Sequence, residues 1–380
     1  MRHGSIVLVA LALGCERRAP PSADPPAATV VVPSSPAAEP APGPPPDASV
    51  PGPSTSTSAR PRPAPERPPA APSALLGGLP RPAGASHAGF AGPVDPSKDA
   101  TWLARLASAP ISEVTRNPGG ATITLRVRFS DGSRAVFKPE QKHSASNFRG
   151  EIADFHLDRI VGFARTAAVV GRTIGYPHLL EHLEASEADP KFIERVREEV
   201  PARDGRVAGA MIAWHAGRLV SAEPPKGWTD GLRSKEPPSE TLVKRLPEWS
   251  DLVVFDFLID NTDRWSGGNV LSLGGGALIF LDNASSFAPW RASRGETTIA
   301  RLSPICRFRR ATVTALRALG PEAAAGARLG ARLASTLAAD PLAPVLSPGQ
   351  VAAVDVRVER LLEHVKRCEA ELGEELVLSL

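Results

Sequence analysis

The chain has 380 residues, enough for two ordinary domains, but 23 of its 40 prolines lie within the first 96 residues. Its formal net charge of +3 comes from acidic and basic residues that are interspersed along the chain, with no block of Lys and Arg. This pattern argues against a dedicated nucleic-acid binder, so we expect no nucleic-acid partner.

The first fifteen residues have the pattern of an export signal. Arg2 and His3 give a short basic start, residues 6–13 form an apolar core, and the segment ends at Cys15 after small residues. The segment resembles a bacterial lipoprotein signal peptide, so residues 1–15 predict an exported protein of the cell envelope that is held to a membrane by a lipid on Cys15. A plain secretory signal and a short apolar anchor are the alternatives.

Residues 16–95 have the composition of a linker. Pro, Ala and Ser dominate, and the stretch from Glu16 to Gly89 contains no aromatic residue. Such a segment cannot bury enough apolar surface to offset the entropy of ordering it. We therefore predict a disordered Pro-rich linker over residues 16–95 and a globular part that begins at residue 96.

The cysteine count of an exported protein bears on its covalent structure. With Cys15 assigned to the lipid anchor, Cys306 and Cys368 remain. Two cysteines in an exported domain indicate one disulfide, which the globular part is expected to contain. Two buried thiols are the alternative.

The sequence around Lys138 predicts two strands and a helix. Apolar residues alternate with Thr and Arg over residues 123–129, an Asp-Gly turn follows, and the returning strand ends at Lys138. An apolar helical stripe then runs from about 147 to 161, with Gly162 as a stop. Three acids, Glu151, Asp154 and Asp158, share the opposite face of this helix, and a solvated face is the ordinary explanation of such a pattern.

The region from residue 249 onward predicts a buried helix, a polar loop and a hairpin. The helix that begins near Trp249 is apolar on nearly all sides, so it should lie in a core. The loop after it contains Asp263. Strands at 270–273 and 277–281 then flank three glycines, which supply the hairpin turn.

The register of this hairpin predicts a convergence of polar residues. Pairing about the glycine turn places Asn269 opposite Leu281, next to Asp282. One loop Asp, one Asn and one strand-end Asp would then meet. This is the order of parts that phosphoryl-transfer enzymes of the protein-kinase type use.

Two other regions predict structural elements. Residues 207–214 are typical of a buried strand, and residues 311–339 of two packed helices. Ser347, Pro348 and Gln350 have the spacing of a capping box at the start of a long helix.

Six segments occur along the chain in an order that is found in a known family. They are 135–139 (AVFKP), 151–160 (EIADFHLDRI), 169–172 (VVGR), 255–264 (FDFLIDNTDR), 280–283 (FLDN) and 306–310 (CRFRR). In this order they resemble the secretory-pathway kinases of the Four-jointed and Golgi casein kinase type. Several motifs in the same order are much more specific than any one of them alone.

The resemblance implies an α+β, two-lobed, protein-kinase-like (atypical kinase) fold. It places an N-lobe-like part at residues 96–214 and a C-lobe-like part at residues 215–380. It also implies an exported kinase that uses ATP with Mg²⁺ or Mn²⁺, and whose acceptor is a Ser/Thr hydroxyl of a protein or a sugar hydroxyl.

The resemblance also implies roles for individual residues. Lys138 would contact the nucleotide phosphates, with Glu151 as its helix partner or as a carboxylate of the metal site. Asp263 would be the catalytic aspartate. Asp282 would bind the metal, and Asn269 is a second candidate metal ligand.

Two other functions remain open from the sequence. The chain has no G-x-G-x-x-G loop, its nearest glycines being Gly119, Gly120 and Gly132, so a catalytically inactive kinase-like nucleotide-binding or interaction module is one alternative. The other is a zinc metallopeptidase, because residues 178–182 fit H-x-x-E-H and would place His178 and His182 on one helical face.

Overall fold

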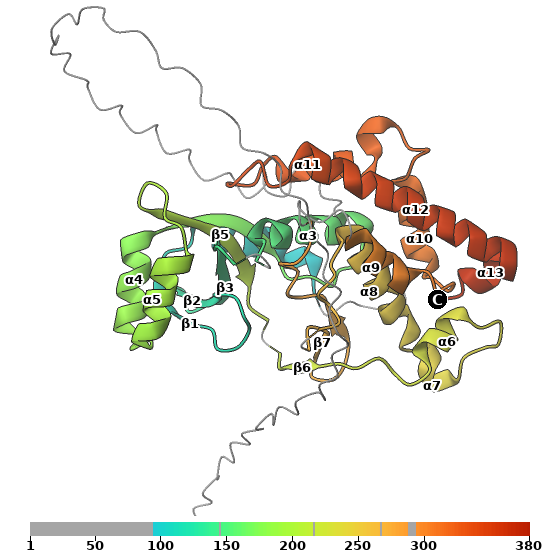
Figure 1. The fold of residues 1–380 in the computed structure, drawn as a ribbon, viewed down its shortest axis with the longest axis horizontal. Coiled ribbons are helices and arrows are strands. Elements are labelled where there is room, and N and C mark those ends of the chain that lie inside the picture. The colour runs from blue at the N-terminus through green and yellow to red at the C-terminus, as the bar shows by residue number, and fades with distance from the viewer. Residues whose placement is uncertain (1–93, 144–145, 216, 267, 288–293) are drawn as a thin grey trace, which may run out of the picture. The chain divides into compact units, whose positions relative to one another are not determined.

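The computed structural model describes most of the chain beyond the predicted linker. Its described residues are 94–143, 146–215, 217–266, 268–287 and 294–380 (Figure 1). All of them belong to one compact unit, Pro65–Leu380. The predicted signal peptide and the linker up to residue 93 lie outside the described residues.

A five-stranded antiparallel sheet forms from the first half of the described chain (Figure 1). Its spatial order is β1-β2-β3-β5-β4. The strand bounds are β1 Ile111–Arg116, β2 Leu125–Phe129, β3 Arg134–Pro139, β4 Val169–Gly175 and β5 Arg206–Ala213. The predicted strands correspond to β2, β3 and β5, while β1 was not predicted.

The central strands place Lys138 deep in the sheet. Alternate residues of β2 are buried, as the period-2 pattern requires, and β3 pairs with β5 so that Lys138 lies opposite Ala210. A Cβ on Gly209 would lie 2.5 Å from the carbonyl oxygen of Lys138. Glycine at position 209 therefore permits the close approach of the two strands beside the lysine.

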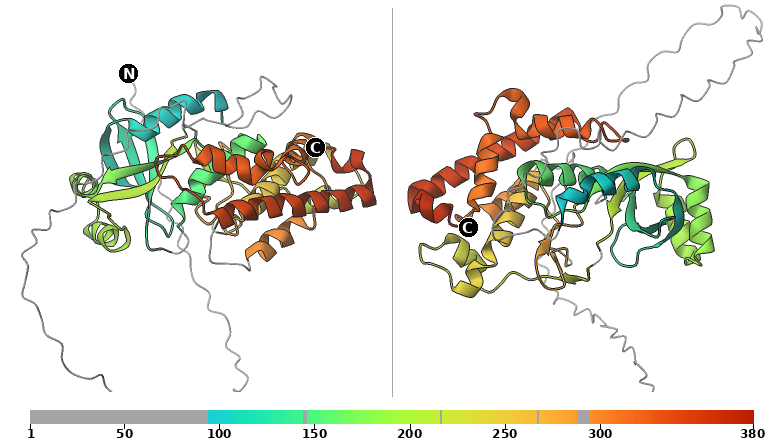
Figure 2. Two further views of the ribbon diagram at one scale, coloured as in Figure 1. Left: turned by 90° about the horizontal axis from the view of Figure 1, so that it is seen from above. Right: turned by 180° about the vertical axis from the view of Figure 1, so that it is seen from behind.

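Helix α3 (Phe148–Val161) lies between this sheet and the C-terminal helices. It contacts β4 and β5 on one side and the helices α10 and α11 on the other (Figures 1 and 2). Every residue of α3 except Arg149 is buried. The expectation of a solvated polar face was therefore wrong, because that face is covered as well. Among the residues that the structure describes, the other helices before β5 are η1 Pro96–Lys98, α2 Asp99–Ser108, α4 Tyr176–Ala185 and α5 Pro190–Glu199.

The second half of the chain contains a small three-stranded sheet and a buried helix. The sheet has the order β6-β7-β8. All fourteen residues of α8 (Leu246–Ile259) are buried, as its apolar sequence predicts. The remaining elements here are β6 Leu219–Ser221, α6 Trp228–Arg233, α7 Glu240–Val243, β7 Leu271–Leu273 and β8 Leu278–Ile279.

The C-terminal region consists of helices. The predicted capping box at Ser347 is present and begins the long helix α12. The helices are α9 Arg294–Leu302, α10 Arg310–Ala318, η2 Ala325–Ala327, α11 Leu329–Leu337, α12 Pro348–Leu372 and α13 Glu374–Val377. None of the helices within the described ranges is long and apolar enough to cross a bilayer.

A disulfide joins Cys306 to Cys368, 62 residues apart in the sequence. The predicted bridge is thus confirmed, and the alternative of two buried thiols was wrong. The bridge connects the segment before α10 to α12. A boundary between an N-lobe-like and a C-lobe-like part at residue 214 stays a prediction.

Candidate active site

Lys138 is held between two carboxylates at the centre of the site. Its Nζ lies 2.5 Å from Oε1 of Glu151 and 2.6 Å from Oδ1 of Asp282. The lysine and glutamate side chains are 10% and 4% exposed, whereas the aspartate side chain is 50% exposed. The Lys138–Glu151 ion pair is therefore buried, whereas the carboxylate of Asp282 beside it is accessible to solvent and ligands.

The charges of this group reinforce one another. Burial alone would lower the pKa of Lys138, but the carboxylates of Glu151 and Asp282 outweigh burial and raise it above the ordinary value. The positive charge of Lys138 in turn lowers the pKa of Asp282. At neutral pH the lysine is therefore an ammonium group and Asp282 a carboxylate.

Glu151 is fixed by contacts from two directions. It lies in the first turn of α3, and its Oε1 also accepts the backbone N–H of Asn283 at 2.9 Å. A Cβ on the preceding Gly150 would lie 2.5 Å from Oγ of Ser286. The absence of a side chain at Gly150 thus lets α3 approach the segment that follows Asp282.

Asp263 lies in the loop that follows α8. The helix ends at Asp260, whose φ of 59° is left-handed and turns the chain away from the helix axis. The next residue, Asn261, is fully buried, and its Oδ1 accepts the backbone N–H of Asp263 at 3.0 Å. The side chain of Asp263 is directed outward and exposed, which is the placement that an acceptor-facing carboxylate needs.

The carboxylate of Asp263 is oriented by two local donors. Nδ2 of Asn269 lies 3.1 Å from its Oδ2, and the hydroxyl of Ser266 donates to its Oδ1. Asn269 therefore lies beside Asp263, one of the two aspartates that it was expected to meet. In this arrangement a metal ion would use the amide oxygen of Asn269.

Arg264 joins the loop of Asp263 to the segment of Asp282. Its guanidinium bonds to Asp256 of α8 at 3.1 Å, to the backbone oxygen of Leu281 and to Oδ1 of Asn283. Leu281 and Asn283 are the two neighbours of Asp282. The arginine is 1% exposed, so it forms a buried connection between the two candidate functional loops.

A second buried acid lies behind Glu151. Oδ2 of Asp154 accepts the hydroxyl of Ser286 at 3.0 Å, while its Oδ1 has no hydrogen-bond partner among the described residues. Burial raises the pKa of Asp154 well above its ordinary value, and the negative charge of Glu151 adds to this effect. Asp154 therefore keeps its proton to a higher pH than an exposed aspartate does.

The structure brings the predicted residues into two groups that Arg264 links. Lys138, Glu151 and Asp282 form one group, and Asp263 and Asn269 form the other. The sequence reasoning assigned no role to three connecting residues, Asn261, Arg264 and Asn283. Each of them stands in a segment that carries the family resemblance, directly beside or near a predicted residue, which is the signal that identifies them.

The oxygen donors of this site suit a hard divalent cation. Carboxylates and amide oxygens are the ligands that Mg²⁺ and Mn²⁺ prefer, and Asp282, Glu151 and Asn269 offer both kinds. A buried ammonium group beside them is suited to a phosphate oxygen. The residues present therefore fit a nucleotide with a divalent metal ion.

The alternative zinc-peptidase centre gains no third ligand from the structure. His178 and His182 do lie on one face of α4, and their Nε2 atoms are 3.0 Å apart. Within the described ranges, however, the clusters of three or more possible metal ligands are limited to Cys306, His364 and Cys368.

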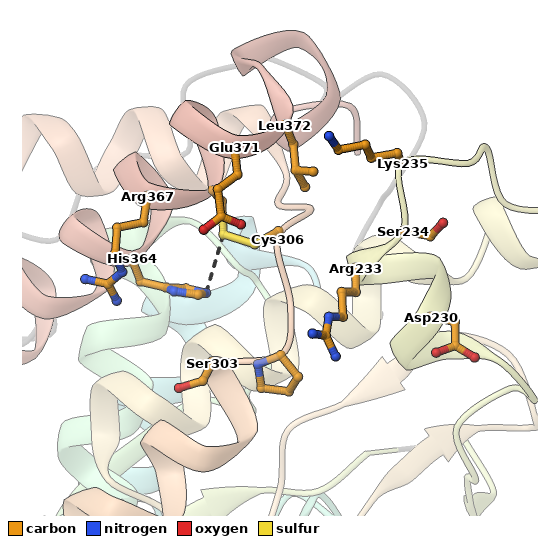
Figure 3. Close-up of a pocket in the computed structure, with 12 residues that line it drawn as sticks. Asp230, Arg233, Ser234, Lys235, Ser303, Cys306, His364, Arg367, Glu371 and Leu372 are labelled. Carbon is orange, nitrogen blue, oxygen red and sulfur yellow. Dashed lines mark hydrogen bonds between the residues drawn. A yellow bond between two sulfur atoms is a disulfide. The ribbon is translucent and has the colours of Figure 1, made fainter.

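A hollow of about 690 Å³ lies beside the Cys306–Cys368 disulfide and is lined by none of the predicted site residues (Figure 3).

The five-stranded sheet with its lysine, the α3 glutamate and the two loop aspartates define an atypical kinase fold. The crystal structure of the Golgi casein kinase with Mn/ADP bound superposes with a TM-score of 0.61 and 21% identity, covering 74% of this chain and 78% of that one. The family described as Golgi casein kinase, C-terminal, Fam20 matches residues 93–188 and 222–377. The chain belongs to this family, and the predicted α+β kinase-like fold is confirmed.

Two curated relatives illustrate the range of the family. Glycosaminoglycan xylosylkinase of Homo sapiens is 30% identical, with 68% of this chain and 72% of that protein covered. Pseudokinase FAM20A of Mus musculus is 28% identical, with 73% of this chain and 59% of that protein covered. The chain thus spans less than two thirds of the length of the mouse protein.

Proposed function

We propose that the protein is a kinase that transfers the terminal phosphoryl group of ATP to a hydroxyl of a protein or a glycan. The observation that carries the proposal is the Lys138 ammonium, held within 2.6 Å of both Glu151 and Asp282 in the fold of this family. Membership of a family that includes a Golgi casein kinase and a glycosaminoglycan xylosylkinase supports both kinds of acceptor.

The site residues divide the work of phosphoryl transfer between them. Lys138 would bind a phosphate oxygen, and Glu151 would hold the lysine in position. Asp282, with Asn269 as a second ligand, would hold a Mg²⁺ or Mn²⁺ ion, which when bound neutralises charge on the phosphates. Asp263 would orient the acceptor hydroxyl and accept its proton.

The two aspartates provide the test of this assignment. Asp263→Asn should leave metal-dependent ATP binding nearly intact and lower transfer by roughly 10²-fold or more. The reason is that the carboxylate of Asp263 stabilises the transition state and does not bind ATP. Asp282→Asn should weaken ATP binding itself as well as transfer. Asp204→Asn, at an exposed position outside the site, is the matched control.

The measurements are ATP binding with Mn²⁺ or Mg²⁺, and phosphate transfer to casein and to a glycosaminoglycan. Wild-type transfer rates in both site variants would contradict the kinase proposal. Metal-dependent ATP binding without transfer to any acceptor would instead favour the inactive nucleotide-binding module, for which the pseudokinase among the relatives is the specific argument.

We also propose that the chain is exported and anchored in the cell envelope by a lipid on Cys15. The support is the signal-like sequence of residues 1–15, together with a disulfide in the folded part. Cys15→Ser should move the protein from the membrane fraction to the soluble fraction.

A further inference from the structure

The histidines of α4 form a chelating pair that the proposed kinase function does not use. His178 and His182 are four residues apart, so they occupy one face of the helix. Their rings meet with Nε2 facing Nε2 at 3.0 Å. The side chain of His178 is 53% exposed, which leaves the pair accessible from solvent.

The remaining ring nitrogen of His178 has a carboxylate nearby. Its Nδ1 lies 3.9 Å from Oε2 of Glu181, on the nitrogen that ligation through Nε2 leaves free. This distance is longer than a hydrogen bond, so Glu181 contributes a nearby negative charge that favours a bound cation.

The spacing of the two nitrogens selects among metal ions. Two metal–nitrogen bonds of about 2.0–2.1 Å that end on atoms 3.0 Å apart meet at an angle of about 90–97°. A tetrahedral ion would require a separation of about 3.3–3.4 Å with the same bond lengths. The observed pair fits two adjacent positions of a tetragonal ion, which is the geometry of Cu²⁺ and Ni²⁺.

We propose that His178 and His182 form a surface binding site for a tetragonal divalent cation, Cu²⁺ or Ni²⁺, with the negative charge of Glu181 nearby and water completing the coordination. The site lies on α4, whose contacts are with β1, β4 and α5, so it is separate from the residues assigned to phosphoryl transfer. A cation site of this kind also explains the H-x-x-E-H pattern at residues 178–182 without a peptidase activity.

The test is a titration of the full chain, without a polyhistidine tag, with Cu²⁺ alone. Excess Mg²⁺ is added in every titration so that Mg²⁺, and not Cu²⁺, occupies the carboxylates of the candidate active site. Loss of either imidazole removes a ligand that is already in place, so His178→Ala and His182→Ala should each weaken Cu²⁺ binding by roughly 10²-fold. Glu181→Gln should weaken it less than either histidine variant does, because only an exposed charge is lost.

The control is His143→Ala, a histidine outside the pair, which should leave the Cu²⁺ affinity unchanged. The electron paramagnetic resonance spectrum of the Cu²⁺ complex should show two nitrogen ligands in the wild type and lose this pattern in both histidine variants. The proposal is overturned if the double variant binds Cu²⁺ as tightly as the wild type, since a hydrogen bond between the two rings would then account for their contact. Tighter binding of Zn²⁺ than of Cu²⁺ and Ni²⁺ would overturn the tetragonal geometry.

Discussion

A single guanidinium, that of Arg264, controls the distance between the two candidate functional loops. Arginine suits this position because its planar fork reaches several acceptors at once, whereas lysine carries the same charge at one point. The contacts with Asp256, Leu281 and Asn283 use this fork in three directions. The charge of Arg264 therefore explains less of its role than its shape does.

Arg264→Lys should lower both transfer and metal-dependent ATP binding, because Asp263 and Asp282 lose their common support. We expect a fall in kcat of roughly 10²-fold, from loss of about 3 kcal/mol of hydrogen bonding to charged groups. Steady-state kinetics and ATP titration measure the two effects. Arg309→Lys is the control, since Arg309 bonds to buried Asp251 at 2.6 Å without contacting either loop, and an equal loss in that variant would contradict the assigned role.

The buried carboxyl of Asp154 should make stability depend on pH in an unusual direction. Its pKa is raised by folding, so the folded state keeps a proton that the unfolded chain has lost. Its contribution to the free energy of unfolding therefore falls as pH rises above the ordinary value of 3.8, by up to about 1.4 kcal/mol per pH unit, until the pH passes the folded pKa.

Asp154→Asn removes this titration, so the variant should gain stability relative to the wild type as pH rises. Urea unfolding of both proteins from pH 5 to 8 measures the difference, in which the contributions of groups that do not interact with Asp154 cancel. Asp256, whose pKa burial raises to about 6, has finished titrating in the upper part of this range. Parallel curves for the two proteins would show that Asp154 is ionised in the folded state.

At the scale of elements, α9 acts on the Asp263 loop through stacked side chains. The guanidinium of Arg301 lies 5.8 Å from the ring centre of Trp265 and donates to the carbonyl oxygen of Thr262. Trp265 also stacks on Trp228 of α6 at 5.5 Å with an interplanar angle of 15°. Helices α6 and α9 therefore hold the loop between them.

Arg301→Ala should loosen this loop and lower transfer by roughly tenfold, because a partly buried cation–π contact contributes about 1–2 kcal/mol. ATP affinity should change less, since Arg301 does not contact the Lys138 group. Arg105→Ala removes a similar contact, over Trp102 at 5.2 Å on α2, and serves as the control for general destabilisation. A weaker ATP affinity with unchanged kcat would contradict a role for α9 in placing Asp263.

How far the elements could be predicted depended on whether their neighbours were local in sequence. The β7–β8 register was correct: Leu271 pairs with Ile279, which is the same register that places Asn269 opposite Leu281. A hairpin register is set by its own turn, so the sequence contains the information. The burial of the polar face of α3 was not predictable, because Glu151 and Asp154 bond to Asn283 and Ser286, each 132 residues away in the sequence.

At the scale of the molecule, α12 bonds to the chain near both candidate functional loops: before the loop of Asp263 and after the segment of Asp282. Nε of Arg357 donates to the carbonyl oxygen of Leu258 at the end of α8, and Gln350 donates to the carbonyl oxygen of Phe287. The capped start of α12 was predictable from Ser347 and Gln350, since a capping box is local. Its support of the loops was not, because these contacts join residues 63 and 99 apart in the sequence.

The Cys306–Cys368 disulfide holds α12 to the segment before α10, and its loss should act mainly on the unfolded chain. A bridge that closes a loop of 62 residues contributes about 4 kcal/mol in the chain-entropy model. The folded state keeps other connections at the same place, since His364 bonds to the carbonyl oxygen of Ile305 at 2.7 Å and the backbone N–H of Phe308 donates to the carbonyl oxygen of Val377 at 2.7 Å.

The double variant C306S/C368S should therefore fold and keep its transfer rate, while the free energy of unfolding in urea falls by about 4 kcal/mol. A reductant should produce the same loss in the wild type and none in the double variant. If the double variant instead lost transfer without losing stability, the bridge would be acting on the folded site through α12 and not on the unfolded chain.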